Sequence, residues 1–135
     1  MISERPRHAG MRHVALFVED LDACLAFYVN LVGMEIEWQP DDDNIYMTSG
    51  ADNVALHRAN GPPSETGQRL DHLGFIVDDM EEVDRWYAWL AQAGVTFRTQ
   101  PKTHRDGARS FYCEDPAGNV VQFIFHPPIS AGGQR

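Results

Sequence analysis

The sequence predicts an α+β fold made of two βαβββ modules in a pseudo-twofold arrangement. Two internal repeats carry this prediction. The segment 71–98 repeats the residue pattern of 12–38, and the segment 110–123 repeats that of 44–57 at one constant offset. Repeats of this size in a fixed order indicate a duplicated supersecondary unit, and one copy alone cannot bury its apolar face. We therefore expect two modules that face each other.

The boundaries of the modules follow from turn residues and from composition. The segment between the modules is rich in Gly and Pro, which mark loops, and both ends of the chain are polar. The sequence divides into a lead-in at 1–11, a first module at 12–60, a linker at 61–69, a second module at 70–126 and a tail at 127–135.

The first module opens with an apolar run at His13–Val18, which favours a strand with both faces covered. Asp20 follows it and is a typical helix N-cap. The next apolar residues recur on one helical face, and they are Leu21, Cys24, Leu25, Tyr28, Leu31 and Val32. Gly33 stands where a left-handed helix C-cap is expected. Three short strands follow, at 34–38, 45–48 and 53–58.

The second module repeats this order, with a strand at 71–77, a helix at 80–91 and then three strands. Asp79 and Glu82 form a capping-box pattern at the helix start. The buried face of the helix is expected to hold Met80, Val83, Tyr87, Leu90 and Ala91. The main difference from the first module is a longer loop at 99–109. This loop gathers Lys102, His104, Arg105 and Arg109 in an otherwise acidic protein.

The composition argues against several classes of partner. The formal net charge of -9 argues against nucleic acid, whose phosphates require a basic surface. No segment approaches the roughly 20 apolar residues of a membrane span, and residues 1–10 contain no apolar run typical of a signal peptide. Cys24 and Cys113 lack the spacing of a zinc knuckle or a disulfide framework. We expect a cytoplasmic protein in which both cysteines are buried as small apolar groups.

Each module opens with a histidine at the same position of its first strand, His13 in one and His72 in the other. Equivalent positions in a pseudo-twofold arrangement come close together near the axis, so a shared metal site is one interpretation. The other interpretation is that each histidine forms a local hydrogen bond at the start of its strand. Histidine is the commonest metal ligand in proteins, and the sequence alone leaves both interpretations open.

Several motifs in a fixed order make the chain resemble a known family. They are the H-x-x-x-x-V-x-D openings at His13 and His72, the Phe27-Tyr28 pair, the L-V-G-M stop at 31–34 and the ending F-Y-C-E-D-P-A-G-N-V-V-Q at 111–122. Over 12–126 the chain resembles the vicinal oxygen chelate superfamily, which includes glyoxalase I, extradiol catechol dioxygenases, methylmalonyl-CoA epimerase, and the fosfomycin and bleomycin resistance proteins. The resemblance implies the glyoxalase/bleomycin resistance/dioxygenase fold, in which the modules form a curved mixed sheet around a cavity.

The resemblance also implies a metal site. The family takes a histidine or glutamine from each module's first strand and a carboxylate or similar group from each last strand, which implies His13, His72 and Gln122 as ligands here. The matching last-strand position of the first module is Leu56, which cannot bind a metal. A divalent Fe, Mn, Ni or Zn ion is expected, held weakly because an amide replaces a carboxylate, and a metal-free protein is the alternative. Further candidates to complete the set are His57, Glu114 and His126.

Strand alternation places His57 on the face opposite Leu56, which favours a solvated or helix-packed histidine. A second resemblance concerns His104 and Tyr112, which look like the histidine and tyrosine that assist ring cleavage in extradiol dioxygenases. In that chemistry a histidine transfers protons and a tyrosine hydroxyl stabilises a developing oxyanion. The alternative is that Tyr112 is a strand aromatic that mirrors Tyr46, with His104 an ordinary loop residue.

Two functions are consistent with the sequence. The first is a metal-dependent dioxygenase, or a lyase or isomerase, that chelates vicinal oxygens of a small substrate on a Lewis-acidic metal. The second is a metal-free small-molecule binding or resistance protein of the bleomycin-resistance type. Trp38 and Tyr46 are expected as aromatic walls of the substrate site, and Arg105 and Arg109 as partners of an anionic group. The resemblance implies a homodimer, and metal content distinguishes the two functions.

Overall fold

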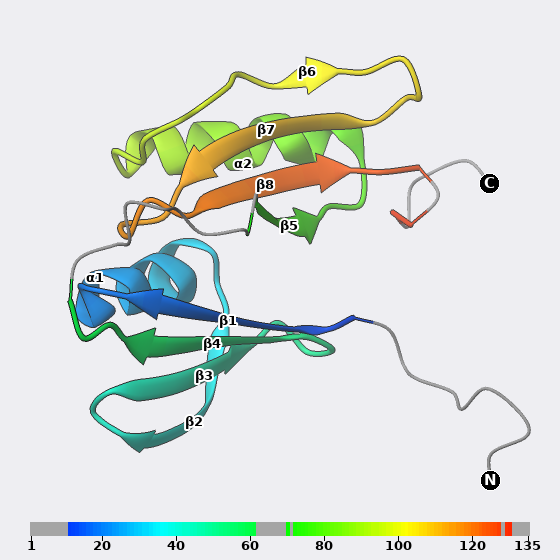
Figure 1. Ribbon diagram of the computed structural model, residues 1–135. Helices are drawn as coiled ribbons and strands as arrows, with labels where there is room; N and C mark the ends of the chain where they lie inside the picture. Colours follow the sequence, from blue (N-terminus) through cyan, green and yellow to red (C-terminus); the bar gives the residue numbers. More distant parts are fainter. Residues whose placement is uncertain (1–10, 62–69, 71, 128, 131–135) are drawn as a thin grey trace, which may run out of the picture. The chain divides into compact units, whose positions relative to one another are not determined.

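The computed structural model describes residues 11–61, 70, 72–127, 129 and 130 (Figure 1). The chain divides into two compact units, Met1–Asn60 and Gly61–Arg135. Each unit holds one four-stranded sheet and one helical segment, in the order expected for a βαβββ repeat. The lead-in, the linker and the tail expected from the sequence lie mostly outside the described residues.

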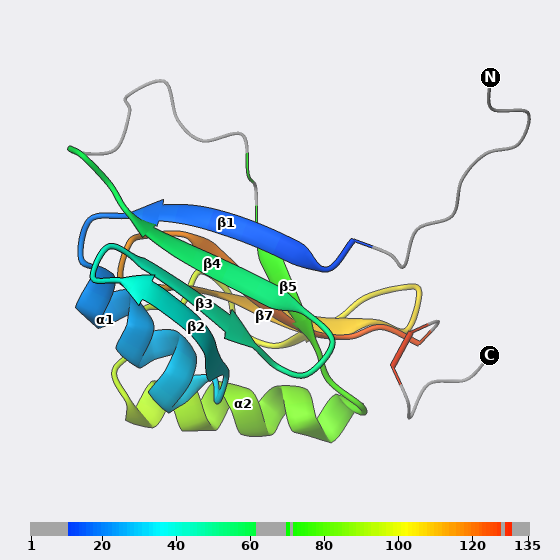
Figure 2. The ribbon, with the colours of Figure 1, turned by 90° about the horizontal axis from the view of Figure 1, so that it is seen from below.

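Unit 1 is a mixed sheet with a helical segment on one face (Figure 2). Its strands, in spatial order, are β1 (His13–Val18), β4 (Asn53–Arg58), β3 (Asn44–Thr48) and β2 (Glu35–Asp41). β1 runs parallel to β4, and the other pairs are antiparallel. Helix α1 (Leu21–Ala26) packs against β4 and continues into a π-helix, η1 (Phe27–Leu31).

The sequence signals around this helical segment act as expected. The Asp20 carboxylate accepts the backbone N–H of Ala23 at 3.0 Å and so caps the helix start. Leu21 and Tyr28, on the expected apolar face, are 1% and 0% exposed. Gly33 follows with a φ of 92°, a left-handed conformation that a side chain would strain. The helix therefore begins and ends where its caps indicate.

β1 is covered on one face only, so the expectation of a strand with both faces covered was wrong. Leu16 and Val18 are almost fully buried, whereas Phe17 between them is 68% exposed. Leu16 lies beside Leu56 in the parallel ladder, and both are buried on the helix side of the sheet. The apolar run therefore includes residues that the fold leaves on the opposite face.

The edge strand β2 is exposed along its whole length. Its pairing with β3 is irregular, with register shifts on both sides of Trp38. It carries three carboxylates and a proline, which are Glu35, Glu37, Asp41 and Pro40. The strand expected at 34–38 is therefore longer than predicted, and the turn that follows it lies at Asp42 and Asp43.

Unit 2 repeats the architecture with a longer helix (Figure 1). Its strands, in spatial order, are β5 (Leu73–Ile76), β8 (Val120–Phe125), β7 (Arg109–Glu114) and β6 (Lys102–Thr103). Helix α2 (Met80–Gln92) packs against β7 and β8. The Asp79 carboxylate caps it by accepting the N–H of Glu82 at 2.9 Å. Neither α2 nor any other helix in the described part of the chain is long and apolar enough to span a membrane.

The face of α2 that meets the sheet is narrower than the sequence predicted. Val83 and Leu90 are completely buried, but Met80 at the helix start and Ala91 near its end are exposed. An aromatic cluster fills the space between helix and sheet. Phe111 and Trp86 both stack on Phe123, with ring centroids 5.4 Å and 4.9 Å from it, respectively. Tyr87 and Phe97 form a tilted pair with centroids 4.3 Å apart. These large rings bury apolar area between the helix and the sheet of unit 2.

The loop expected at 99–109 contains the short strand β6, which pairs with β7. A tight turn follows β6, in which the N–H of His104 donates to the carbonyl of Ala108 at 2.7 Å. Gly107 in this turn has a φ of 88°. The loop therefore stays attached to the edge of the sheet and returns directly into β7.

The two units differ by one residue in the hairpin turn before their last strand. The first unit joins β3 to β4 through four residues, 49–52, and the second joins β7 to β8 through five, 115–119. The sequence repeat matched 44–57 with 110–123 at one constant offset. That match is correct up to the turn and is wrong by one residue in the strand after it. A slip of one residue places every side chain of a strand on the other face of its sheet.

The pairing across each hairpin identifies the true counterparts. Tyr46 pairs with Ala55 in the first unit, and Tyr112 pairs with Gln122 in the second. Since the two tyrosines match in the repeat, Ala55 and not Leu56 is the counterpart of Gln122. The conclusion that the first unit lacks a metal-binding side chain at this position stays, because alanine cannot bind a metal.

Candidate functional site

The candidate metal ligands and aromatic residues lie on the face of each sheet that is turned away from the helix of its own unit, here called the helix-free face. In unit 1 this face presents alternate residues of the strands. They are His13, Ala15, Phe17, Asn53, Ala55, His57, Asn44 and Tyr46, joined by Trp38 of β2. In unit 2 they are His72, Gly74, Ile76, Gln122, Ile124, Ser110 and Tyr112.

His13 is held by a chain of two hydrogen bonds. Its Nδ1 lies 2.7 Å from Oδ1 of Asn53, and Nδ2 of Asn53 donates to Oε1 of Glu37 at 3.3 Å. A carboxylate only accepts hydrogen bonds, so Asn53 turns its amide nitrogen to Glu37 and its oxygen to His13. In neutral His13 the proton then sits on Nδ1, and Nε2 keeps its lone pair. Histidines that bind metals are oriented in this way.

His57 shares the helix-free face with His13. Its Nδ1 lies 2.6 Å from Oδ1 of Asn44, and its ring lies 5.8 Å from that of Phe17. The sequence interpretation set His57 apart because it assigned the ligand face to Leu56. Leu56 is instead completely buried on the helix side. His57 is therefore neither packed against the helix nor separated from the candidate site.

An aromatic pair adjoins these histidines. The rings of Trp38 and Tyr46 stack with centroids 5.1 Å apart and planes 24° apart. Trp38 is 58% exposed, and Tyr46 also meets His57 edge to face at 5.9 Å. A stacked and partly exposed pair presents a flat apolar surface, which suits the wall of a small-molecule site. The structure thus places both expected substrate-binding aromatics on the same face as His13.

Tyr112 is the centre of the helix-free face in unit 2. His72 meets its ring edge to face at 5.2 Å, and Nε2 of Gln122 donates to its hydroxyl at 3.1 Å. Oε1 of Gln122 remains an acceptor and lies beside Gly74, where an added Cβ would stand 3.3 Å from it. A side chain at position 74 would therefore crowd Gln122. The structure brings two of the expected metal ligands, His72 and Gln122, to one tyrosine.

His104 lies beside the same face. Its Nε2 is 3.4 Å from Oγ of Ser110, a weak contact at the long end of hydrogen bonding. Ser110 and Tyr112 are alternate residues of β7 and share one face of the sheet. The structure thus places the histidine and the tyrosine of the dioxygenase-like pair on the same side of unit 2.

The two loop arginines have different surroundings. Arg109 donates to the carboxylate of Asp84 on α2 at 2.7 Å and to the hydroxyl of Thr103 at 2.9 Å. This ion pair holds Arg109 on the helix side, on the face opposite Tyr112. Arg105 is exposed and forms no ion pair with the residues described. Arg105 is therefore available to an anionic ligand without breaking an existing ion pair.

By the chemistry of their donor atoms, the three expected ligands suit a divalent metal ion, although none of them is a carboxylate. In the described ranges no three His, Cys, Asp or Glu side chains gather into a metal-binding group. The donors supplied by His13, His72 and Gln122 are imidazole nitrogens and an amide oxygen, which suit ions of the Fe, Ni and Zn type. Neutral donors attract a cation less than carboxylates do, so such a site would bind its ion weakly.

Of the other candidates for this site, Glu114 forms an ion pair with Arg98 at 3.1 Å. His126 lies at the end of the last strand, where its backbone N–H, and not its imidazole, donates to Oγ of Ser130 at 2.8 Å. Both cysteines are buried, as expected. Burial, followed by the carboxylates of Asp115 and Glu114, raises the pKa of the Cys113 thiol to about 12. Cys113 is therefore protonated at neutral pH and unsuited to act as a nucleophile.

Sequence reasoning missed the side chains that orient the histidines of unit 1. They are Asn53, Asn44, Glu37 and Asp41. A signal was available, since asparagine is disfavoured in strands and here opens both β3 and β4. The repeat alignment concealed it by matching Asn53 with Asn119. Asn119 instead donates to Asp115 at 2.9 Å inside the hairpin turn.

The chain consists of two βαβββ units, and each unit has a histidine on its helix-free face, at or just before the start of its first strand. This combination of fold and site defines a class of proteins. The chain belongs to the Glyoxalase/Bleomycin resistance protein/Dioxygenase superfamily, whose family model matches residues 10–123. The resemblance found in the motifs is thereby confirmed.

Individual relatives span several activities. The chain is 28% identical to uncharacterized protein PA2024 of Pseudomonas aeruginosa, over 92% of this chain and 94% of that protein. It is 25% identical to biphenyl-2,3-diol 1,2-dioxygenase of Sphingomonas paucimobilis, over 87% of this chain but 39% of the dioxygenase. The structure of lactoylglutathione lyase from Agrobacterium tumefaciens matches with a TM-score of 0.72 and 27% identity, covering 90% of this chain and 96% of the lyase. A particular activity must therefore be argued from the residues of the site.

Proposed function

We propose that this protein is a divalent-metal-dependent enzyme that acts on a small substrate with vicinal oxygens, as an extradiol-type dioxygenase or as a lyase or isomerase. His13, His72 and Gln122 are the proposed ligands of an Fe, Mn, Ni or Zn ion. The observation that carries the proposal is the hydrogen-bonded chain from Glu37 through Asn53 to His13. It leaves a lone pair on Nε2 of His13, as in metal sites where a second residue orients the ligand.

A bound divalent ion would polarise the substrate oxygens as a Lewis acid. The Tyr112 hydroxyl accepts the amide N–H of Gln122, so its own proton is available for donation to a developing oxyanion. His104, on the same side of unit 2, is the proposed acceptor of a substrate proton. Trp38 and Tyr46 are the proposed walls for a flat substrate.

The charged end of the substrate is assigned to Arg105. Arg109 was expected to share this role, but its ion pair with Asp84 occupies it on the other face of the sheet. Replacing Arg105 with Ala is expected to weaken the binding of an anionic substrate, while the same change at exposed Arg85 on α2 serves as a control. Equal affinities in the two variants would remove Arg105 from the proposal.

A second function, metal-free binding of a small molecule as in the bleomycin-resistance branch, is favoured by one specific observation. Ala55 is the first unit's counterpart of Gln122, so neither last strand supplies a carboxylate. The aromatic pair Trp38–Tyr46 would serve such binding without a metal ion.

Metal content decides between the two functions. The measurement is mass spectrometry on full-length protein purified without a metal-affinity tag, with the double variant His13→Ala, His72→Ala and the single control His126→Ala beside it. We expect near-stoichiometric Fe, Mn, Ni or Zn in the wild type and in the control, and its loss in the double variant. A wild type without metal after reconstitution would exclude the enzyme proposed here and leave the binding function.

We also propose that the protein is a homodimer, the state that the family resemblance implies. Light scattering on the eluted protein would then give twice the protomer mass of 15.2 kDa. A mass that stays at the protomer value over a wide concentration range would contradict this proposal.

A further inference from the structure

We infer that His57 is a ligand-binding residue in its own right: its Nε2 accepts a hydrogen bond from a planar ligand that carries a hydroxyl or N–H group at the edge of its ring. The residue lies outside the proposed set of metal ligands. The inference holds with or without a metal ion, so it does not depend on the function proposed above.

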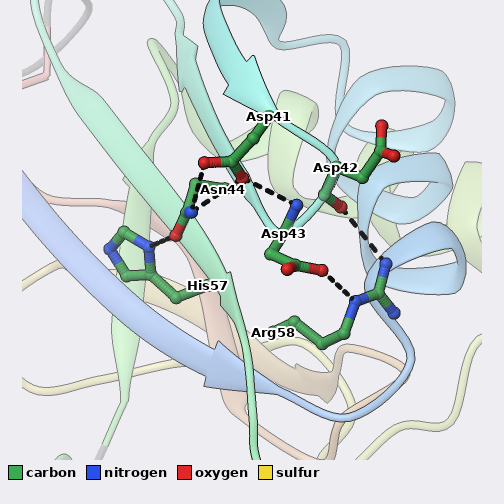
Figure 3. A network of polar contacts seen from close by, with 6 residues as sticks. All are labelled: Asp41, Asp42, Asp43, Asn44, His57 and Arg58. Atoms are coloured by element: carbon green, nitrogen blue, oxygen red, sulfur yellow. Dashed lines mark hydrogen bonds and ion pairs between the residues drawn. The ribbon is translucent and has the colours of Figure 1, made fainter.

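Two side chains, Asn44 and Asp41, orient His57 (Figure 3). Nδ1 of His57 lies 2.6 Å from Oδ1 of Asn44. Nδ2 of Asn44 donates to both carboxylate oxygens of Asp41, at 2.8 and 3.1 Å. The backbone N–H of Asp43 donates to Oδ1 of Asp41 at 2.8 Å and fixes the carboxylate in the turn. The imidazole is thus tied through Asn44 to the end of the β2–β3 hairpin.

The direction of these hydrogen bonds determines which nitrogen of His57 carries the proton. Asp41 can only accept, so the amide group of Asn44 points toward it and the amide oxygen points toward His57. Nδ1 of His57 must then be the donor, and in the neutral ring Nε2 holds the lone pair. No described residue forms a hydrogen bond with Nε2. In the described part of the chain no buried side-chain nitrogen or oxygen lacks a partner, so this nitrogen reaches solvent, where water or a ligand can donate to it.

The neighbours of His57 indicate the class of ligand. Phe17 and Tyr46 contact its ring at 5.8 and 5.9 Å, and Trp38 stacks on Tyr46. Phe17 and Trp38 are 68% and 58% exposed, so part of each side chain is accessible to a planar molecule. The aromatic side chains can pack against a flat ring, and Nε2 of His57 can accept a hydrogen bond from a donor at the edge of that ring.

The Asp43 carboxylate, in the turn of the same hairpin, binds Arg58 of β4 and not the His57 chain. Nε of Arg58 donates to the Asp43 carboxylate at 2.8 Å, and Nη2 donates to the carbonyl of Asp42 at 3.2 Å (Figure 3). Arg58 therefore does not compete for Asp41. The two neighbouring carboxylates consequently have separate functions, one orienting His57 and the other holding Arg58.

The second unit has no histidine and asparagine at the positions that match His57 and Asn44. The βαβββ fold therefore does not require this hydrogen-bonded pair. Position for position in the pairing, Ile124 is the counterpart of His57 and Ser110 that of Asn44. A hydrophobic side chain thus stands at the equivalent position of the repeated framework. The contrast favours a role for His57 in binding.

The tautomer of His57 is the first test, read from imidazole ¹⁵N shifts in the NMR spectrum of full-length protein and assigned with His57→Phe. We expect the Nδ1–H form in the wild type and in Asp43→Asn. Asp41→Asn should give a mixture of tautomers, because the new amide no longer dictates the orientation of Asn44. A wild type with the proton on Nε2, or an unchanged tautomer in Asp41→Asn, would overturn the inference.

The second test uses phenol and anisole as matched probes, since only phenol has a donor. In chelator-treated wild-type protein, NMR titration should show phenol bound roughly two- to tenfold more tightly than anisole, the value of one neutral hydrogen bond. The preference should vanish in His57→Phe and weaken in Asp41→Asn, while Asp43→Asn keeps it. Equal binding of the two probes by the wild type, or no binding of phenol, would overturn the inference.

Discussion

Restoring a carboxylate at Gln122 tests the proposed metal site most directly. Glutamate has nearly the shape of glutamine, so Gln122→Glu fits the space that Gly74 leaves beside the side chain. The Tyr112 hydroxyl now accepts from Gln122 at 3.1 Å, and it can rotate its proton to donate to the new carboxylate. The change keeps the hydrogen bond between position 122 and Tyr112, and the free energy of unfolding is expected to move by about 1 kcal/mol or less.

The metal affinity, in contrast, should rise substantially. Removing a residue that merely supports a ligand costs about 10- to 100-fold in affinity, so gaining a negative charge on the ligand itself should give at least a similar increase. This corresponds to roughly 1.4 to 2.7 kcal/mol of binding free energy. A competition titration against a coloured chelator measures it for Zn or Mn, at fixed ionic strength.

The matched control for this charge is Gln92→Glu, at an exposed residue that ends α2. It adds the same charge to unit 2 away from the helix-free face, and it should leave the metal affinity unchanged. Equal affinities in the wild type and Gln122→Glu, or an equal gain in the control, would refute the assignment of Gln122 as a ligand.

Three further predictions concern other parts of the molecule. Asn53→Leu removes the acceptor that orients His13 and should weaken metal binding by roughly 10- to 100-fold while the circular dichroism spectrum stays that of the wild type; unchanged affinity would contradict the role of Asn53. Leu56→Ala opens a cavity on the helix side and should lower the free energy of unfolding by about 2 to 5 kcal/mol in urea, against about 0.5 kcal/mol or less for the exposed Ile36→Ala. Cys113, with a pKa raised from 9.0 to about 12, should resist alkylation at pH 8 until the protein unfolds. The pKa of this thiol is higher in the folded protein than in the unfolded chain. Its contribution to the free energy of unfolding is therefore fully present below pH 9 and is lost as the pH rises toward 12.

Local signals in the sequence predicted the helices well. Asp20 and Asp79 both cap the helices that they precede, and Gly33 adopts the left-handed conformation expected after the first helix. Each of these depends on a few consecutive residues, whose chemistry determines the local backbone. The order of the elements followed from the same signals, read twice along the repeat.

The faces of the strands were harder to predict, because they depend on register. One extra residue in the turn before β8 shifts the alignment of the last strands and makes Ala55, not Leu56, the counterpart of Gln122. Alternation shows which residues share a face but not which face meets the helix. That ambiguity removed His57 from the expected site. The hydrogen bonds from Asn53 and Asn44 to the histidines depend on pairing between strands and were equally beyond a reading of the sequence alone.

The composition of β2 affects how this protein behaves at high concentration. An edge strand exposes unpaired N–H and C=O groups that can recruit the same strand of another molecule and so begin a fibril. In β2, Pro40 lacks the N–H donor, and the register shifts around Trp38 interrupt the regular ladder that such recruitment needs. The carboxylates of Glu35, Glu37 and Asp41 would also repel their copies in an incoming strand. The edge is therefore protected against backbone pairing with a second copy, and we expect that a dimer of this protein would not extend its sheet through β2.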